Sequence, residues 1–239
     1  VCAEKEYMIN LRRDFHRHPE LSLQERRTAG VIEQELERFE ISHTRIGATG
    51  VLGILRGTQS GSGVVALRAD IDALPIVEQT NAPYASRSEG VMHACGHDCH
   101  IAMMLGAIRI LHELRANLRG EVRVLFQPAE EISIGSRRMI SAGALDGVES
   151  IYGAHIWSEV EAGTVSIDSG PRMANTDWFR VDVSGSSAHG AMPHKGVDAI
   201  VVGAAIIDAL QVVVSRDVSP FDPVVLTIGE FHGGVARNV

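Results

Sequence analysis

A cluster of cysteine and histidine residues stands at the start of an apolar segment, in the stretch "GVMHACGHDCHIAMMLGAIRIL" of residues 90–111. Two of the three cysteines of the chain, Cys95 and Cys99, lie here among three histidines and an aspartate. Zinc accepts cysteine and histidine ligands, and manganese, cobalt or nickel can also bind such mixed sites. Three explanations are open: a metal site built on Cys95 and His97, a thiol redox pair, or packing. We expect Cys99 and His100 to pack beside the site or to support it rather than to bind metal.

Further polar residues directly follow three predicted strands. They are Asp70 and Asp72 after "VVALR", Glu130 and Glu131 after "VRVLFQP", and His155 after "IYGA". In open α/β sheets, reactive groups collect beyond the carboxyl ends of the strands, so all these clusters could face one cleft. Each has a plainer explanation when taken alone: solvated loop carboxylates, the acidic first turn of a helix, or a surface histidine. Their convergence favours an active site.

Two adjacent carboxylates can divide the work of hydrolysis. One of Glu130 and Glu131 would bind a metal, and its neighbour would take a proton from the water that the metal activates. A redox function fits less well, because the C-x-x-x-C spacing of Cys95 and Cys99 is one residue wider than the usual C-x-x-C pair. The residues therefore favour metal-assisted hydrolysis.

The segments that would position these residues alternate between strands and helices. Apolar periodicity predicts two N-terminal helices over 7–20 and 21–39, the second with Ser22 as its N-cap. The remaining predictions are strands at 51–55, 63–75, 121–131 and 151–157 and helices at 102–115 and around 136–142. This order predicts an α/β fold with a mostly parallel sheet sandwiched by helices.

The pattern changes towards the end of the chain. The segments 178–185 and 224–231 alternate between apolar and polar residues, as strands with one wet face do, and a helix is predicted between them over 197–215. We therefore expect a catalytic metal-binding domain over 1–177 and the start of a smaller α+β lid domain over 178–239. Because a β-α-β piece rarely stands alone, we expect the second domain to be incomplete.

The composition argues against some classes of function. A net charge of −8 and a pI of about 5.8 make a nucleic-acid surface a poor fit. No uninterrupted apolar run approaches the ~18 residues of a membrane helix, and the charged N-terminal segment lacks the apolar stretch of a secretory signal. Three cysteines, a small odd number, favour a reducing compartment. We expect a cytoplasmic protein with neither a nucleic-acid nor a membrane partner.

Four stretches together resemble the M20 metallopeptidase family: "GVMHACGHDCH", "FQPAEE", "GAHIW" and "SAHGAMPHKGVDAI". They stand in the family's order, and the similarity runs from about Arg12 to the end of the chain. The branch they resemble most holds hippurate hydrolases, aminoacylase-like enzymes and auxin-conjugate hydrolases. The resemblance implies a two-metal catalytic domain with an inserted lid domain that also forms a homodimer.

The resemblance also implies roles for individual residues. Cys95, His97, Glu131 and His155 would bind two divalent metal ions (Zn, Mn, Co or Ni), with Cys95 as the bridge between them. Glu130 would be the general base that activates the water shared by the two ions.

Three further residues match family positions near the reaction. Asp72 matches an aspartate that orients a metal ligand. His189, in "SAHGAMPH", resembles a lid histidine that steadies the developing oxyanion, often in the partner subunit's site. Asn238, in "ARNV", matches a lid asparagine near the substrate. The family's fifth ligand, a histidine near its C-terminus, lies on a segment that this sequence lacks, so we expect a C-terminally truncated chain.

These implications predict a metal-dependent amidohydrolase, similar to aminoacylases and carboxypeptidases, that cleaves the amide bond of N-acyl amino acids or dipeptide-like substrates through a metal-activated water. Glu130 would pass the proton of the water to the leaving amine, and His189 would donate to the oxyanion. The alternative is an inactive truncated remnant that acts as a metal-binding and dimerisation module. The retained base Glu130 and the retained supporting residue Asp72 argue against that alternative.

Overall fold

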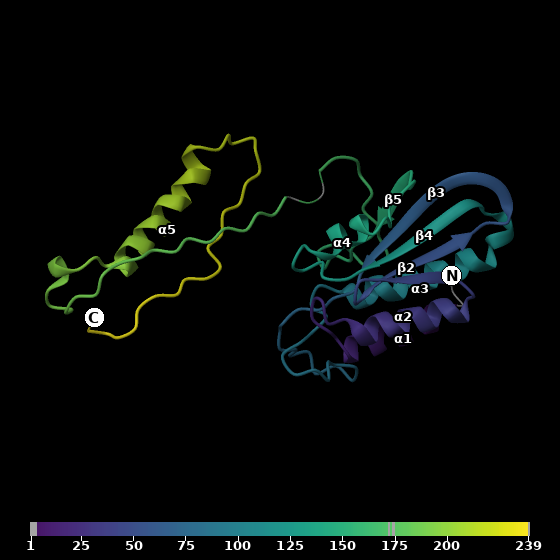
Figure 1. Cartoon of the computed structure of the whole chain (residues 1–239), viewed down its shortest axis with the longest axis horizontal. Coiled ribbons are helices and arrows are strands. Elements are labelled where there is room, and N and C mark those ends of the chain that lie inside the picture. Colours follow the sequence, from purple (N-terminus) through teal and green to yellow (C-terminus); the bar gives the residue numbers. More distant parts are fainter. Residues whose placement is uncertain (1–3, 172, 174, 239) are drawn as a thin grey trace. The chain divides into compact units, whose positions relative to one another are not determined.

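The architecture comes from a computed structural model that describes residues 4–171, 173 and 175–238 (Figure 1). Contacts between residues divide the chain into two units, Val1–Ile167 and Asp168–Val239. The predicted assignment of a catalytic domain to 1–177 and a lid to 178–239 stays a prediction.

A five-stranded mixed sheet forms the centre of the first unit, in the spatial order β1-β2-β4-β3-β5. Strand β3 runs parallel to both β4 and β5, whereas β2 is antiparallel to β1 and β4. The parallel core confirms the predicted fold class, and β1 is not among the predicted strands. The strands are β1 (Ser42–Ile46), β2 (Gly50–Arg56), β3 (Gln59–Asp70), β4 (Arg119–Gln127) and β5 (Ser150–Gly153).

Three helices cover one face of this sheet: α1 (Lys5–Arg17), α2 (Arg26–Arg38) and α3 (His97–Glu113), which is followed by a short 3-10 turn, η2 (Arg115–Asn117). Their apolar sides share one hydrophobic core with the strands. The largest fully buried side chains of that core are Phe15, Ile32, Leu36, Ile101, Leu105 and Phe126.

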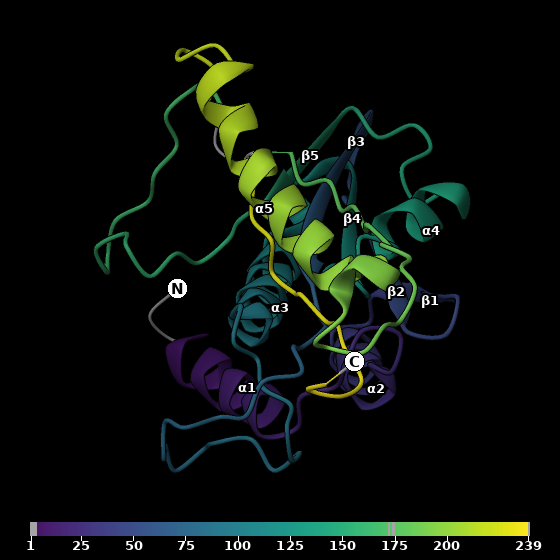
Figure 2. The ribbon, with the colours of Figure 1, turned by 90° about the vertical axis from the view of Figure 1, so that its left-hand side faces the viewer.

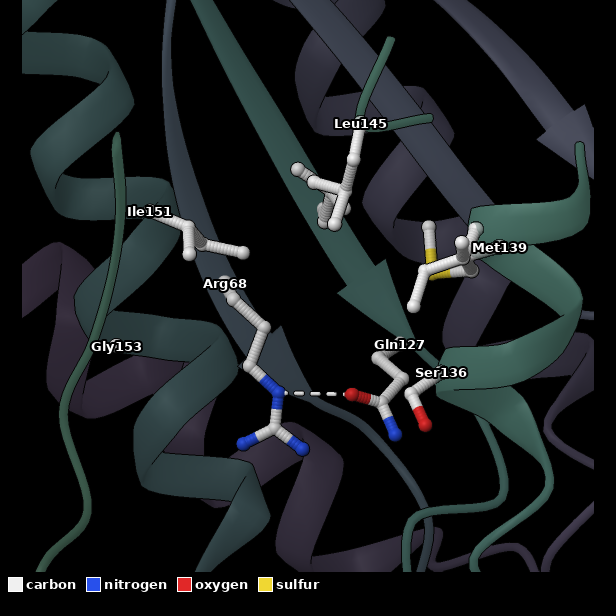
Figure 3. A pocket seen from close by; sticks show the side chains of 9 residues that line it. Arg68, Gln127, Ser136, Met139, Leu145, Ile151 and Gly153 are labelled. Atoms are coloured by element: carbon white, nitrogen blue, oxygen red, sulfur yellow. Dashed lines mark hydrogen bonds between the residues drawn. The ribbon is translucent and has the colours of Figure 1, made fainter. Parts of the chain in front are cut away.

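The other face of the sheet carries α4 (Gly135–Ser141), and Figure 2 shows α3 and α4 on opposite sides of the strands. Successive residues of β4 point to opposite faces, so Phe126 packs with the first core while Leu125 packs against Met139 of α4. A pocket of about 330 Å³ opens on this face between α4 and β5. Its walls are mainly apolar, and Arg68 donates to Oε1 of Gln127 at one end (Figure 3).

The start of α2 differs from the prediction. Ser22 was expected to cap this helix, but the helix begins four residues later, with Glu25 in the position before it. Leu23 has a left-handed backbone with φ of 69°, which no α-helix accommodates. The hydroxyl of Ser22 instead donates to Oδ2 of Asp72 at 2.6 Å.

The second unit contains one long helix, α5 (Ala199–Arg216), and a short turn, η3 (Pro193–Lys195). Asp198 caps α5 by accepting from two backbone N–H groups, as the N-cap rule requires. The predicted strands 178–185 and 224–231 are not formed within residues 175–238, where the only ladder contact is an isolated bridge outside both segments. Alternation of apolar and polar residues suits a segment to lie in a sheet, but a strand forms only when a neighbouring strand accepts and donates its backbone hydrogen bonds. Neither segment has such a neighbour within residues 175–238.

Helix α5 also bears on the expected absence of a membrane segment. Over its 18 residues it is long and apolar enough, by length and composition alone, to cross a membrane, and it is almost entirely exposed within the chain. The same composition suits a helix that packs against protein, and a single helix of this kind is weak evidence for a membrane span.

Candidate metal centre

The candidate residues lie beyond one edge of the sheet, because β3, β4 and β5 are parallel and end together. Asp70, the last residue of β3, pairs with Gln127, the last residue of β4. Two residues earlier, Arg68 pairs with Gly153, which ends β5. The polar residues after each strand therefore converge, as the sequence predicts.

The loop into α3 brings a cysteine and a histidine to the same edge. Gly96, with a left-handed φ of 88°, separates Cys95 from His97, the first residue of α3. A Cβ on Gly96 would lie 2.3 Å from Cδ1 of Ile156, which follows His155 in the chain. Glycine is therefore needed here so that the α3 loop can pass close to the segment after β5.

Cys95, His97 and His155 form the first group able to hold an ion, with one ligand atom of each within 4.8 Å of the others. Sγ of Cys95 lies 3.4 Å from Nε2 of His155. Nδ1 of His155 donates to the carbonyl oxygen of Ile156 at 2.6 Å, which leaves the lone pair of Nε2 directed towards the thiol. A thiolate and imidazole nitrogens are donors that zinc prefers.

His97 also meets the two glutamates of the loop after β4. Its Nε2 lies 3.8 Å from Oε1 of Glu131 and 4.0 Å from Oε2 of Glu130. Its Nδ1 donates to the carbonyl oxygen of Asp72 at 2.9 Å, which leaves a lone pair on Nε2 of the neutral ring. Nε2 of His97 and Oε1 of Glu131 are buried and have no hydrogen-bond partner within the described residues. A cation between such facing acceptors would satisfy both.

The electrostatics of this cluster favour positive charge. Burial alone lowers the pKa of His97, but the neighbouring side chains of Asp72 and Cys95 outweigh burial and raise the pKa to about 11. Burial raises the pKa of Glu131; the charge of His97 lowers it, but the carboxylates of Glu130 and Asp72 raise it further, and the net shift is upward. The site therefore attracts a cation: a proton on His97, or a metal ion in place of that proton.

Asp72 joins two of the candidate ligands. Its Oδ2 accepts from the hydroxyl of Ser22 at 2.6 Å and from the backbone N–H of Glu131 at 3.0 Å, and its Oδ1 lies 3.4 Å from Nδ1 of His97. Burial raises the pKa of Asp72, but the nearby ring of His97 and the hydrogen bond from Ser22 outweigh it and keep the pKa below its usual value. The buried carboxylate therefore stays charged beside His97.

His100 uses both of its ring nitrogens for other contacts. Its Nδ1 donates to Oδ1 of Asp70 at 2.6 Å, and its Nε2 accepts the backbone N–H of Ile156 at 3.0 Å. The other oxygen of Asp70 lies 2.8 Å from Nη1 of Arg68. His100 thus ties α3 to the segment that carries His155, although Asp70, His97 and His100 also lie close enough to be a third ligand group.

A further network beside the site was missed at the level of sequence. Oδ2 of the fully buried Asp98 accepts from Nδ1 of His16 at 2.7 Å and lies 2.8 Å from Nε of Arg12 in an ion pair. His16 also lies 3.2 Å from Glu78. Burial, and then the charge of Asp98, raise the pKa of the Cys99 thiol. A thiol that resists ionisation is a poor redox nucleophile, which argues against the redox interpretation.

Comparison with known proteins identifies the family. Residues 66–230 match the family described as peptidase family M20/M25/M40. The chain belongs to this family. The resemblance predicted from the four sequence stretches is therefore confirmed.

Its relatives in this family include named hydrolases. The chain is 47% identical over 241 residues to an N-acyl-L-amino acid amidohydrolase of Geobacillus stearothermophilus, covering 100% of this chain and 65% of that protein. It is 44% identical to an N-acetylcysteine deacetylase of Bacillus subtilis, covering 97% of this chain and 61% of that protein. The chain thus spans less than two thirds of the length of these relatives.

Two solved structures share the fold. A putative aminohydrolase from methicillin-resistant Staphylococcus aureus matches with a TM-score of 0.81 and 38% identity over 99% of this chain and 63% of that chain. The YXEP protein of Bacillus subtilis, described as a dinuclear metal-binding peptidase of the M20 family, matches with a TM-score of 0.69 and 47% identity over 72% of this chain and 48% of that chain.

The two predicted lid residues lie together in the second unit. The backbone N–H of Gly190, next to His189, donates to the carbonyl oxygen of Asn238 at 3.0 Å. Nδ1 of His189 accepts the backbone N–H of Ala191 at 3.1 Å, so the proton of a neutral ring stands on Nε2. Their roles near a substrate stay predictions of the family resemblance.

Proposed function

We propose that the chain provides the metal centre of an amidohydrolase that cleaves the amide bond of N-acyl amino acids. The observation that carries the proposal is a pair of ligand groups that share His97, one with Cys95 and His155 and the other with Glu130 and Glu131, at the edge where three parallel strands end. The named activities of the two relatives support the choice of an N-acyl amino acid as substrate.

The donor set fits two divalent metal ions. One thiol, two imidazoles and a carboxylate suit Zn, Mn, Co or Ni, and the orphaned Nε2 of His97 and Oε1 of Glu131 are acceptors that a cation would satisfy. When bound, a pair of such ions lowers the pKa of a water molecule and polarises the substrate carbonyl. A related M20 structure described as dinuclear supports the number of ions.

Glu130 and Glu131 differ in a way that supports different roles. The Glu131 side chain is 19% exposed and its backbone is hydrogen-bonded to Asp72, whereas the Glu130 side chain is 39% exposed. The freer carboxylate can reach solvent, take a proton from water and move it to a leaving amine. We assign the general base to Glu130 and metal binding to Glu131.

The remaining roles are carried by the second unit. The Nε2–H of His189 would donate to the oxygen that becomes negative, and Asn238 would contact the substrate. Exposed apolar residues of α5, among them Ile200, Val201 and Val212, would pack against a second copy in a homodimer. We further propose a cytoplasmic location, in keeping with the free thiols of Cys95 and Cys99.

Metal content and hydrolysis test this function together. After exhaustive dialysis of the full chain without added metal, we expect elemental analysis to find bound divalent ions, and N-acetyl amino acids to be hydrolysed. The variant Glu130→Gln should retain the metal and lose hydrolysis. A wild-type chain that retains no metal, or hydrolysis that persists in Glu130→Gln, would refute the proposal. Metal retention without hydrolysis in the wild type would instead support a binding and dimerisation module.

A further inference from the structure

The loop that carries Glu130 and Glu131 has an unfavourable backbone. It joins β4 to α4, and two of its non-glycine residues, Ala129 and Ser133, have left-handed φ values of 49° and 56°. Side chains with a Cβ rarely adopt this conformation, because the Cβ approaches the neighbouring carbonyl oxygen. The loop therefore keeps its shape only if surrounding contacts hold it.

Some of these contacts are within the loop. The N–H of Ser133 donates to the carbonyl oxygen of Glu130 at 2.8 Å, and the N–H groups of Ile134 and Gly135 both donate to the carbonyl oxygen of Ala129 at 3.2 Å. These bonds use the carbonyl oxygens of 129 and 130. The N–H groups on either side of Glu130 need other partners.

Two buried carboxylates from distant segments accept those N–H groups. Oδ2 of Asp72 accepts the N–H of Glu131 at 3.0 Å, and Oε1 of Glu25 accepts the N–H of Ala129 at 2.8 Å. Glu130 thus stands between two amides, each bound to its own carboxylate. Asp72 was predicted as a supporting residue, whereas Glu25, 104 residues from Ala129, was not.

Glu25 is an unusual residue for a purely local role. It is fully buried and precedes α2, yet its side chain makes no cap hydrogen bond to that helix. Its Oε2 has no hydrogen-bond partner within the described residues. Burying a carboxylate is unfavourable unless it is compensated, here by the positive end of α2 and by the N–H of Ala129.

We infer that Glu25 is a positioning residue that holds the backbone of residues 129–131 and so directs the carboxylates of Glu130 and Glu131 towards His97. The inference rests on the proposed metal centre for its functional part. Without the acceptor, the buried N–H of Ala129 is left unpaired and its left-handed backbone is free to relax. A change in the backbone dihedral angles of Ala129 changes the direction of the chain that follows, and this moves the side chains of Glu130 and Glu131 away from His97.

Three substitutions of Glu25 and a matched control separate positioning from general stability. Glu25→Ala removes the acceptor, and Glu25→Asp withdraws it by one methylene while keeping the charge. Glu25→Gln keeps an oxygen that can accept the N–H of Ala129. Its amide NH2 group would take the place of Oε2, which has no hydrogen-bond partner within the described residues. The control is Glu35→Gln. Glu35 is a second buried glutamate, on α2 itself, and its carboxylate accepts from Tyr7 and Arg38 instead of the loop.

The readouts are the Co²⁺ dissociation constant of the full chain and the visible absorption spectrum of the bound Co²⁺, which reports its ligands. We expect Glu25→Ala and Glu25→Asp to weaken Co²⁺ binding by about 10–100-fold with an altered spectrum, the usual effect of losing a supporting residue. Glu25→Gln and Glu35→Gln should stay within about threefold of the wild type, whatever their melting temperatures, because neither removes the acceptor from Ala129. If Glu25→Ala does not fold, Glu25→Asp decides.

Unchanged affinity and spectrum in the Asp and Ala variants would overturn the inference, as would an equal loss in the Glu35→Gln control. A wild-type chain that binds no Co²⁺ refutes the proposed function, and amide hydrogen exchange then decides the positioning role alone. Faster exchange of the peptide over residues 126–135 in the Glu25→Asp variant, but not in the control, supports it. Equal exchange in all variants overturns it.

Discussion

Replacing Asp72 with asparagine tests whether the negative charge of this carboxylate supports metal binding by His97, because it replaces a carboxylate oxygen by an amide nitrogen and leaves the rest of the side chain in place. Oδ2 of Asp72 accepts from both Ser22 and Glu131, so the asparagine oxygen takes that position and the amide nitrogen takes the place of Oδ1. An N–H group then faces Nδ1 of His97 at the 3.4 Å now occupied by a carboxylate oxygen. The fold of the loop is kept, and the charged partner of His97 is lost.

The size of the effect follows from that lost contact. Oδ1 of Asp72 is a charged neighbour of His97 rather than its hydrogen-bond acceptor, because Nδ1 donates to the backbone carbonyl of Asp72. Replacing a residue that supports a metal ligand typically costs about 10–100-fold in metal affinity, and we expect a loss of that size. Loss of the carboxylate also lowers the pKa of His97 and so reduces competition from its proton. Because the carboxylate stabilises a divalent ion more than a single proton, the net change is still a loss of affinity.

The assay is competition between the chain and a chelator of known affinity for Zn²⁺, with melting of the metal-free proteins as a check on folding. The control is Asp146→Asn, an exposed aspartate of the same unit. Equal Zn²⁺ affinities for wild type and Asp72→Asn would refute the electrostatic reasoning, since they would mean that this carboxylate does not support His97.

Three other outcomes follow from the same structure. Cys95→Ala should lower the metal content per chain measured by elemental analysis, because it removes the thiol next to His155. Gly135→Ala should lower the melting temperature, because the added Cβ would lie 1.5 Å from the carbonyl oxygen of Pro128. Gly30→Ala lies inside α2, where the added Cβ would have no atom within 4 Å, and it should stabilise the chain by about 0.5–1 kcal/mol. The hydrogen bond to Asp98 raises the pKa of His16, so its contribution to stability is complete below the ordinary pKa of 6.5 and is lost as pH rises through the raised value. His16→Gln should therefore flatten the fall in melting temperature between pH 6 and pH 9, and an unchanged slope would contradict this assignment.

The strand ends were predictable because two local signals coincide there. Continuous apolar runs mark buried parallel strands, and carboxylates or histidines directly after them mark the edge where such strands end. Asp70, Glu131 and His155 were all found in this way. The structure adds two facts that the sequence does not contain: Nε2 of His97 is the ring nitrogen without a hydrogen-bond partner within the described residues, and Glu130 is more exposed than Glu131.

The supporting residues were less predictable. Glu25 reaches a loop 104 residues away, and His16 reaches Asp98 across 82 residues. Glu25 stands in a polar stretch that is typical of a solvated helix surface, and Asp98 stands inside the cysteine and histidine cluster. In neither place does a local signal show that the charge will be buried. Their burial depends on how α1, α2 and α3 pack on the sheet, and that is a property of the whole unit.

The second unit shows the opposite case, in which a clear local pattern did not become the predicted element. Alternation over 178–185 and 224–231 is strong, yet neither segment forms a strand within residues 175–238. A helix such as α5 satisfies its backbone hydrogen bonds by itself and appeared as predicted. A strand depends on a neighbour, so its sequence pattern predicts only a capacity to pair.

The pairing of β3 with β4 and β5 also has a consequence for how the chain folds. Each strand ends in a different part of the candidate centre, and one residue along a strand corresponds to about 3.3 Å. A slip of β4 by one residue would move Glu131 by that distance and reverse the faces of Leu125 and Phe126. An ion bound to these residues would therefore stabilise only the sheet in its native register, by mass action. Refolding with a divalent ion present should consequently recover more native chain than refolding in a chelator.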